Sequence, residues 1–255
     1  MRARAESSDP LTCANLASLP ELDAAIGDCR ACPRLVHWRE QVAVTKRRAY
    51  LDWDYWGRPV PGFGPPDAVI ALVGLAPAAH GGNRTGRAFT GDAAGDFLYA
   101  ALHAVGLASQ PTSTRRGDGL ELRGVRITMP VHCAPPDNTP TPAERDTCRP
   151  WLVRELELLR PTLRVVVPLG AFAWQALMPA LGEAGWAVPR PRPAFGHGIH
   201  AVVGDGEPAL HLLGCYHPSQ RNTFTGVLTP GMLEDVLRDA VRLAGGTRRA
   251  PADEG

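Results

Sequence analysis

The sequence predicts a single α/β domain with three layers, α/β/α, around a central, mostly parallel four-stranded sheet. Short apolar runs that suit buried strands alternate along the chain with segments that carry helix caps. The chain has 255 residues, 44% of them hydrophobic and 21% charged, which is enough to form one sizeable core. In such a sheet, ligands bind beside the carboxyl ends of the strands.

The two ends of the chain are small, polar and without periodicity. We therefore expect disordered tails at residues 1–18 and 246–255, and one domain over residues 19–245. A first helix is expected over residues 19–27. The aromatic, Gly- and Pro-rich stretch 50–66 is expected to be an ordered loop.

Four apolar runs are predicted to be strands, and a helix is predicted after each of them. The strands are expected within residues 67–75, 124–133, 162–170 and 209–219. The helices are expected within residues 91–107, 144–159, 171–181 and 228–244. Asp92 stands near the start of the first of these helices, and Thr141 with Glu144 forms a capping box before the second, where Pro142 takes the first helical position.

Composition places few limits on function. The first ten residues lead into no apolar segment typical of a secretory signal, and no run approaches the ~18 apolar residues of a membrane span. A cytoplasmic protein that does not bind membranes is expected. The net charge is +1, from 27 basic and 26 acidic residues, which argues weakly against a dedicated nucleic-acid binder but allows a local grip on phosphates.

Six cysteines in a reducing compartment are expected to be metal ligands or core residues rather than disulfides. Cys29 and Cys32 form a C-x2-C pair, and Cys133 and Cys148 follow singly. Four such thiolates can hold either a [4Fe–4S] cluster or tetrahedral zinc, and their spacing does not separate the two. The alternative is that Cys133 and Cys148 are ordinary core residues. Cys13 and Cys215 are not expected to be ligands.

Two polar loops follow predicted strands. The first, residues 74–92, is rich in Gly and Ala and holds one aromatic residue, Phe89, and one carboxylate, Asp92. It allows backbone to approach a ligand closely. It matches neither common phosphate-binding pattern, so a nucleotide cofactor is disfavoured.

The second loop, residues 216–226, contains His217 with Ser219 and Asn222 beside it, and a third polar group, Asn138, follows another strand. A lone histidine is more often structural than catalytic. Because the carboxyl ends of parallel strands meet at one edge, however, Asp92, Asn138 and His217 are expected to converge on one cleft.

These motifs resemble those of the family 5 uracil-DNA glycosylases, the type B, iron–sulfur branch of the uracil-DNA glycosylase superfamily. The resemblance rests on GLAPAAHGGNRTGRAFTGD, on VHCAPPDN through Cys148, and on HPSQRNTFTG, and it covers residues 22–243. It implies a uracil-DNA glycosylase-like fold and a [4Fe–4S] cluster on Cys29, Cys32, Cys133 and Cys148. The sister family 4, with a narrower substrate range, carries glutamate where this chain has Leu75, so family 5 is favoured. The segment Thr128-Met129-Pro130 departs from relatives, which often have a small or amide residue there.

The resemblance also implies roles for individual residues. The flipped base would be bound by Leu75, Ala76, Ala78, Asn83 and Phe89, with Phe89 stacking on it. Asp92 would stabilise positive charge on the sugar and orient water, Asn138 would position that water or the DNA strand, and His217 would donate a hydrogen bond to the departing base. Candidates to contact DNA are Arg84, Arg87, Ser219, Arg221 and Asn222, although the arginines could equally be ordinary solvated side chains.

The resulting hypothesis is a monomeric DNA repair enzyme. It would act on uracil-containing DNA, double- or single-stranded, and on other deaminated bases such as hypoxanthine, and would leave an abasic site that starts base excision repair. Two other classes remain open. One is an iron–sulfur oxidoreductase, which the lack of a flavin or nicotinamide motif disfavours. The other is a cluster- or zinc-stabilised DNA-binding module without catalysis, which would leave Asp92, Asn138 and His217 unexplained.

Overall fold

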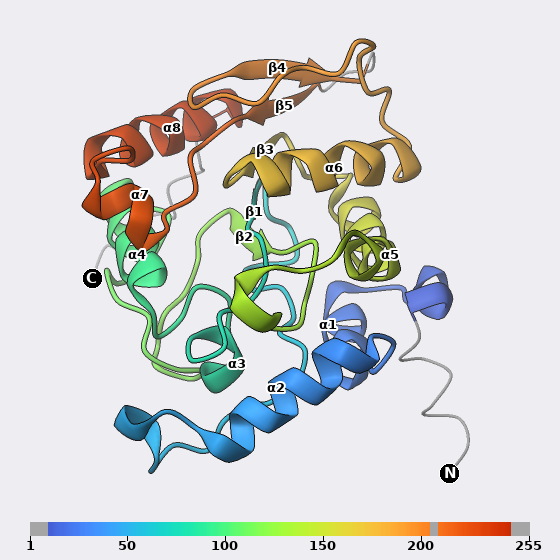
Figure 1. Cartoon of the computed structure of the whole chain (residues 1–255). Helices are drawn as coiled ribbons and strands as arrows, with labels where there is room; N and C mark the ends of the chain where they lie inside the picture. Colours follow the sequence, from blue (N-terminus) through green and yellow to red (C-terminus); the bar gives the residue numbers. More distant parts are fainter. Residues whose placement is uncertain (1–9, 205–208, 246–255) are drawn as a thin grey trace, which may run out of the picture.

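The computed structural model describes residues 10–204 and 209–245, and a five-stranded sheet lies at its centre (Figure 1). The strand order is β2-β1-β3-β5-β4. The strands are β1 (Ile70–Val73), β2 (Val125–Thr128), β3 (Val165–Pro168), β4 (His200–Val203) and β5 (Leu210–Leu213). The first three and β5 pair in parallel, and β4 pairs antiparallel with β5. The predicted single α/β domain with a mostly parallel sheet is confirmed, but the sheet has five strands rather than four.

The missed strand, β4, lies at an edge of the sheet. It pairs only with β5, and its residues His200 and Val202 are exposed whereas Val203 is buried. An edge strand covered on one face lacks the continuous apolar run that marks the buried strands of this chain. That half-exposed pattern is why the sequence did not predict it.

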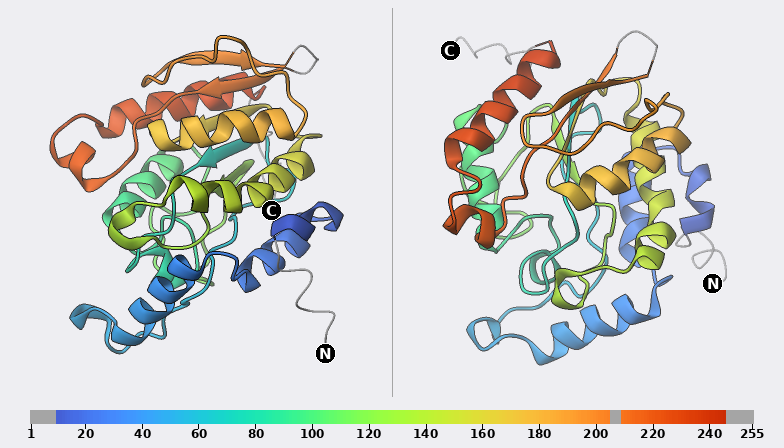
Figure 2. Two further views of the ribbon diagram at one scale, coloured as in Figure 1. Left: turned by 45° about the vertical axis from the view of Figure 1, so that its right-hand side comes forward. Right: turned by 45° about the horizontal axis from the view of Figure 1, so that its top comes forward.

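Helices cover both faces of the sheet, as the right-hand view of Figure 2 shows. Ala71, Val73 and Val166 point to the face covered by α1, α5 and α6, and Ile70 and Leu72 point to the face covered by α4 and α8. The α-helices are α1 (Leu19–Asp28), α2 (Pro33–Thr45), α3 (Gly82–Thr85), α4 (Ala93–Ala104), α5 (Pro142–Leu159), α6 (Ala171–Glu183), α7 (Gln220–Phe224) and α8 (Pro230–Leu243). The 3-10 helices are η1 (Pro10–Asn15), η2 (Arg48–Tyr50) and η3 (Pro136–Asn138).

Side-chain caps set where several helices begin. The capping box predicted before α5 is present, with Thr141 and Glu144 each bonded to the other's backbone amide and Pro142 at the first position. Asp92 caps α4 by accepting from the Gly95 amide. The predicted starts of α4 and α5 are therefore confirmed.

The N-terminal region holds more structure than the sequence predicted. Residues 10–18 were expected to belong to a disordered tail, but Pro10–Asn15 forms η1, which packs on α5 and buries Cys13. Helix α2 was not predicted either, although Pro33 directly after Cys32 is a helix-start signal. The tails predicted at residues 1–9 and 246–255 lie outside the described residues. Within residues 10–204 and 209–245, no helix is long and apolar enough to cross a membrane.

A buried ion network fastens two helices to the sheet. Arg126 on β2 donates to Glu155 on α5 at 2.5 Å and to Asp23 on α1 at 2.6 Å, and it also reaches the Gly64 carbonyl at 3.1 Å. Thr128 donates to the second oxygen of Glu155. Since Glu155 is fully buried, loss of Arg126 would leave its charge uncompensated in the core, whereas loss of Glu155 would leave Asp23 as the remaining charged partner of Arg126.

We predict that Glu155→Ala lowers the free energy of unfolding by about 3–5 kcal/mol, because it leaves the Arg126 guanidinium partly unpaired. Chemical denaturation followed by circular dichroism measures the loss. The matched control is Glu234→Ala, which removes a surface ion pair with Arg238 and is expected to cost at most about 1 kcal/mol. Equal losses in the two variants would contradict the prediction.

Candidate active site

A cavity of about 750 Å³ lies beside the carboxyl ends of the parallel strands. Residues from the loops after β1, β2 and β5 line it together with residues that follow α2. The predicted site residues in its wall are Leu75, Ala76, Ala78, Phe89, Asp92, Asn138, His217, Ser219 and Arg221. The loops therefore bring the three polar groups Asp92, Asn138 and His217 to one cleft.

Asp92 caps helix α4 and also lines the cavity. Its Oδ1 accepts from the Gly95 amide at 2.9 Å, which fixes the carboxylate at the N-terminus of α4. Burial raises the pKa of Asp92, while the amides of Gly95 and Ala94 act in the opposite direction. A Cβ atom at Gly81 would lie 2.1 Å from Asp92 Oδ2, so only glycine lets the backbone pass there.

Phe89 offers an aromatic surface inside the same cavity. Its backbone is left-handed, with φ of 50°, which is uncommon for a bulky residue. Glycines make room for it: a Cβ at Gly74 would lie 2.7 Å from the Phe89 ring, and one at Gly95 would lie 1.8 Å from the Phe89 carbonyl oxygen. The ring centroid stands 5.9 Å from that of His217. Strain of this kind is often found at functional sites.

His217 is a neutral hydrogen-bonding group at neutral pH. Burial lowers its pKa to about 4. The Asn222 side chain donates to the His217 carbonyl at 2.8 Å, and Ser219 caps α7 by accepting from the Asn222 amide. Asn222 was expected to contact DNA, but its amide holds the histidine loop in shape. Ser219 also lines the cavity.

Asn138 reaches the cavity from η3. Asp137 and Asn138 both have φ of 53°, in the left-handed region. Asparagine tolerates this conformation better than most residues because its short amide can bond locally. The side chain of Asn138 is exposed, so it is open to a ligand.

The sequence did not predict any contribution to the cavity from the segment after α2. Arg47 and Tyr50 line the cleft from the segment after α2, where Tyr50 lies against Arg84 of the loop after β1. Arg47 is exposed. No local pattern distinguishes it from neighbouring basic residues, because its place beside the cleft depends on how α2 packs.

Besides Asn222, three predicted site residues do not line the cavity. Asn83 is fully buried, and its amide donates to the Arg39 carbonyl at 3.1 Å. Arg84 is 4% exposed and donates to the carbonyls of His80 and Gly91. The prediction that Asn83 binds the base and that Arg84 contacts phosphate is therefore wrong, because backbone carbonyls already bind their donors.

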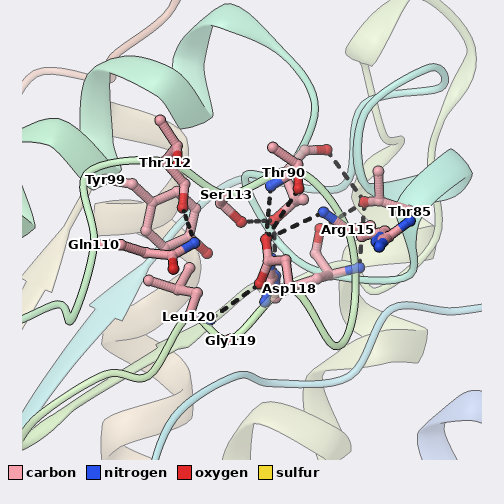
Figure 3. Close-up of polar contacts among 12 residues, drawn as sticks. Thr85, Thr90, Tyr99, Gln110, Thr112, Ser113, Arg115, Asp118, Gly119 and Leu120 are labelled. Atoms are coloured by element: carbon pink, nitrogen blue, oxygen red, sulfur yellow. Dashed lines mark hydrogen bonds and ion pairs between the residues drawn. The ribbon is translucent and has the colours of Figure 1, made fainter.

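Arg87 also bonds inside the protein, to Asp118. Figure 3 shows Asp118 among its neighbours Thr90, Ser113 and Leu120. The ion pair is 2.5 Å long and buried, and Arg87 also donates to Thr90, whose hydroxyl lies 2.6 Å from that of Ser113. Although burial would raise it, the pKa of Asp118 is held well below its usual range by Arg87 and backbone amides. Arg87 thus ties the Phe89 loop to residues 113–120 and is not a phosphate contact.

The four predicted cysteine ligands line a second, narrow cavity, between α1, α2 and α5. Cys29, Cys133 and Cys148 are buried and Cys32 is half-buried. Burial raises the pKa of Cys32 and of Cys133 to about 11, so a metal must displace their protons to bind. Within the described ranges, no group of three or more His, Cys, Asp or Glu side chains meets the geometry for a single metal ion.

The surroundings of these thiols suit an anionic group. Arg39 is buried and donates to Cys133 Sγ at 2.8 Å and to the Cys29 carbonyl at 3.0 Å. Its Nε and the indole nitrogen of Trp151 are buried without a partner, and both residues line the cavity. Such donors are normally satisfied. Thiolates bound to a cluster would supply the negative charge and the acceptors that these groups lack.

The comparisons with known proteins agree with this geometry. The family model described as "Uracil DNA glycosylase superfamily" matches residues 61–241. The type-5 uracil-DNA glycosylase of Mycobacterium tuberculosis is 57% identical over 228 residues, which cover 89% of this chain and 82% of that protein. The enzyme of the same name from Thermus thermophilus is 53% identical, over 85% of this chain and 94% of its own length.

The chain belongs to the type-5 uracil-DNA glycosylases. The type-4 uracil-DNA glycosylase of Pyrobaculum aerophilum is similar over less of the chain, with 38% identity over 49% of it and 55% of that protein. The type-5 enzyme of the same organism is 48% identical over 86% of the chain. The type-5 assignment is confirmed over the type-4 alternative.

In this type-5 chain, the family match contains the whole cavity wall except Arg47 and Tyr50. Cys133 and Cys148 lie within the match, whereas Cys29 and Cys32 precede it. The N-terminal helices α1 and α2 therefore add one half of the cysteine cavity and one side of the cleft to the shared glycosylase fold.

Proposed function

We propose that this chain removes uracil from DNA by hydrolysing the bond between the base and the sugar, and so initiates base excision repair. The observation that carries the proposal is the convergence of Asp92, Asn138 and His217, from three separate loops, on the cavity that also contains Phe89. The chain's membership of the type-5 uracil-DNA glycosylases supports the same reaction.

The base must leave the duplex before it can react, because the stack hides the bond to be broken. In the cavity, Phe89 stacks on the flipped base, and the backbone from Leu75 to Ala78 meets its edge. Stacking of this kind is worth roughly 1–3 kcal/mol per base. A uracil mispaired with guanine costs less to extrude than a paired base, which contributes to selectivity.

Cleavage breaks the bond from C1′ of the sugar to nitrogen of the base, and positive charge develops on the sugar as negative charge develops on the base. The Asp92 carboxylate stabilises the sugar cation and orients the water that attacks C1′. Asn138 positions that water or the strand. The neutral His217 donates a hydrogen bond to the base carbonyl oxygen, where charge grows. The proton of the water finally compensates the charge on the released base.

The contacts to the DNA backbone come from other residues than the buried arginines. Arg47 and Arg221 stand in the cavity wall and are the cations placed to meet phosphates beside the flipped nucleotide. Phe224, at the end of α7, is 80% exposed. An apolar side chain in that position can wedge between base steps while the nucleotide is out of the stack.

The wider substrate range and setting are part of the same proposal. The cavity has room for a purine such as hypoxanthine, so its size does not restrict the proposed activity to uracil. Double- and single-stranded DNA both fit a site that binds one extruded nucleotide. We propose that the enzyme acts as a monomer in the cytoplasm, where its cysteines stay reduced.

Cys29, Cys32, Cys133 and Cys148 would hold a [4Fe–4S] cluster, as the shared cavity and the unsatisfied donors of Arg39 and Trp151 support. When bound, the cluster cross-links the protein and supplies no step of base excision. Its ligands come from the α1–α2 connection, the segment after β2, and α5. It would therefore fasten the N-terminal helices to the rest of the domain.

Incubation with uracil-containing duplex, followed by alkali, tests the function. We expect strand breaks at uracil, and weaker cleavage when hypoxanthine or ethenocytosine replaces it in otherwise identical duplexes. Binding without cleavage would support a DNA-binding module. If the protein neither binds nor cleaves the duplex, the oxidoreductase is the remaining alternative. Undamaged duplex is the control.

Separate substitutions of Asp92 and His217 distinguish the roles of these two residues. His217→Ala is expected to lose roughly 10²–10³-fold in single-turnover rate, as for removal of one preorganised donor, and Asp92→Ala to lose more. Because Asp92 must be ionised, the rate falls as pH drops through its raised pKa. Equal losses, or the reverse order, would refute the division of labour.

Purified anaerobically, the protein is expected to be brown, to contain four irons and to absorb at roughly 400 nm, where iron–thiolate clusters absorb. Cys148→Ser should lose iron and lower the unfolding temperature. Cys215→Ser is the matched control, because Cys215 is also buried but lies outside the cysteine cavity, and it should keep its iron. Active, colourless protein with stoichiometric zinc would overturn the cluster assignment.

A further inference from the structure

Arg84 has contacts that place it in the support of the active site. It lies on α3, in the loop between β1 and α4. Its Nε donates to the His80 carbonyl at 2.7 Å, and its terminal nitrogen donates to the Gly91 carbonyl at 2.9 Å. His80 directly precedes Gly81, and Gly91 directly precedes Asp92. One guanidinium group therefore joins the two backbone segments that flank the Asp92 carboxylate.

Two aromatic rings hold this guanidinium in place. It lies 3.9 Å from the ring centroid of Tyr50 and 4.1 Å from that of Trp53. Arg84 is 4% exposed, so these contacts are formed away from water, where cation–π attraction is strongest. Tyr50 itself lines the cavity. The side chain therefore has little freedom to move, and its planar fork is already aimed at both carbonyls.

The backbone around Arg84 is built to admit it. Gly91 has φ of 80°, and a Cβ there would lie 2.3 Å from the Arg84 guanidinium. At Gly81, a Cβ would lie 2.1 Å from Asp92 Oδ2. The backbone at residue 91 thus runs closer to Arg84, and the backbone at residue 81 closer to Asp92, than a residue with a side chain would allow. The loop holds the carboxylate and the guanidinium on either side of one narrow stretch of backbone.

We propose that Arg84 is the positioning residue for Asp92, and that it acts by clamping the His80 and Gly91 carbonyls while Tyr50 and Trp53 hold its guanidinium flat. The proposal rests on the proposed catalytic role of Asp92. A shift of about 1 Å in a reacting group can cost on the order of 10²-fold in rate, so a residue that never touches substrate can still set the rate.

Arg84 also acts on Asp92 through its charge. Burial raises the pKa of Asp92, and the Arg84 cation works against that rise. Removal of the cation should therefore move the acid limb of the rate to higher pH. The other charged or titratable groups that face Asp92 are Asp96 on its own helix and, around the cavity, Arg47, Tyr50, His80, His217 and Arg221.

The experiment compares Arg84→Met and Arg84→Lys in the full-length protein, by single-turnover excision of uracil as a function of pH. Arg84→Met removes both charge and clamp, so its plateau rate should fall on the order of 10²-fold and its acid limb should move to higher pH. Arg84→Lys keeps the charge but cannot donate to both carbonyls as a planar fork. It should lose plateau rate while its acid limb stays near that of the wild type.

Arg160→Met is the control for the loss of an arginine that bonds two carbonyls away from the cavity, at an exposed position. Arg160 also donates to two successive carbonyls, Ala184 and Gly185, at 3.0 and 3.1 Å, and stacks on Trp186, but it does not line the cavity. It should lower the unfolding temperature without changing the plateau rate or the acid limb. If Arg84→Met does not fold, Arg84→Lys decides alone.

Wild-type plateau rates and acid limbs in the Arg84 variants would overturn the proposal, as would the same changes in Arg160→Met. Asp92→Asn, measured in parallel, separates this failure from a failure of the proposed function. If Asp92→Asn is inactive and the Arg84 variants behave as the wild type, only the positioning role is refuted. If Asp92→Asn retains full activity, the proposed catalytic role of Asp92 is wrong and the role of Arg84 falls with it.

Discussion

The hydrogen bond from the Gly95 amide to Asp92 sets the geometry on which the site depends. Through it, the carboxylate that faces the cavity is also the cap of α4, whose residues Leu98 and Leu102 are fully buried against the sheet. Core packing of α4 therefore contributes to the position of the carboxylate, together with the loop that passes it. The loop passes the carboxylate at Gly81 and the Arg84 guanidinium at Gly91, and at neither position does a side chain fit.

The same burial that fixes the site tunes its two titratable groups in opposite directions. It raises the pKa of Asp92 and lowers that of His217 to about 4, because removal from water penalises whichever form is charged. At neutral pH the imidazole is neutral and can donate to a base that gains negative charge. An imidazolium at that position would also oppose the positive charge on the sugar. A low pKa for His217 thus suits a reaction in which the cation is stabilised by the carboxylate alone.

The sequence predicted what local patterns encode and missed what distant packing decides. Buried strands and the caps at Asp92 and Thr141 carry their own signals, and the convergence of Asp92 and His217 follows from the rule that ligands meet the ends of parallel strands. The edge strand β4 carries no continuous apolar run. Arg84 and Arg87 look like solvated loop arginines, because their partners Tyr50 and Asp118 lie more than thirty residues away in the chain. Only the fold shows that both are internal ties.

Helix α2 connects the cysteine cavity with the cleft. Near its middle, Arg39 donates to Cys133, and the Arg39 carbonyl accepts from Asn83 on α3, next to Arg84. Just beyond its end, Arg47 and Tyr50 form one side of the cleft. The backbone of residues 56 and 57 bonds to the carbonyls of Arg84 and Asn83, which joins the same segment to α3 again. A group that binds the four cysteines would therefore fix the helix that supports the Arg84 clamp. This gives the proposed cluster a structural reason to exist in an enzyme whose reaction transfers no electrons.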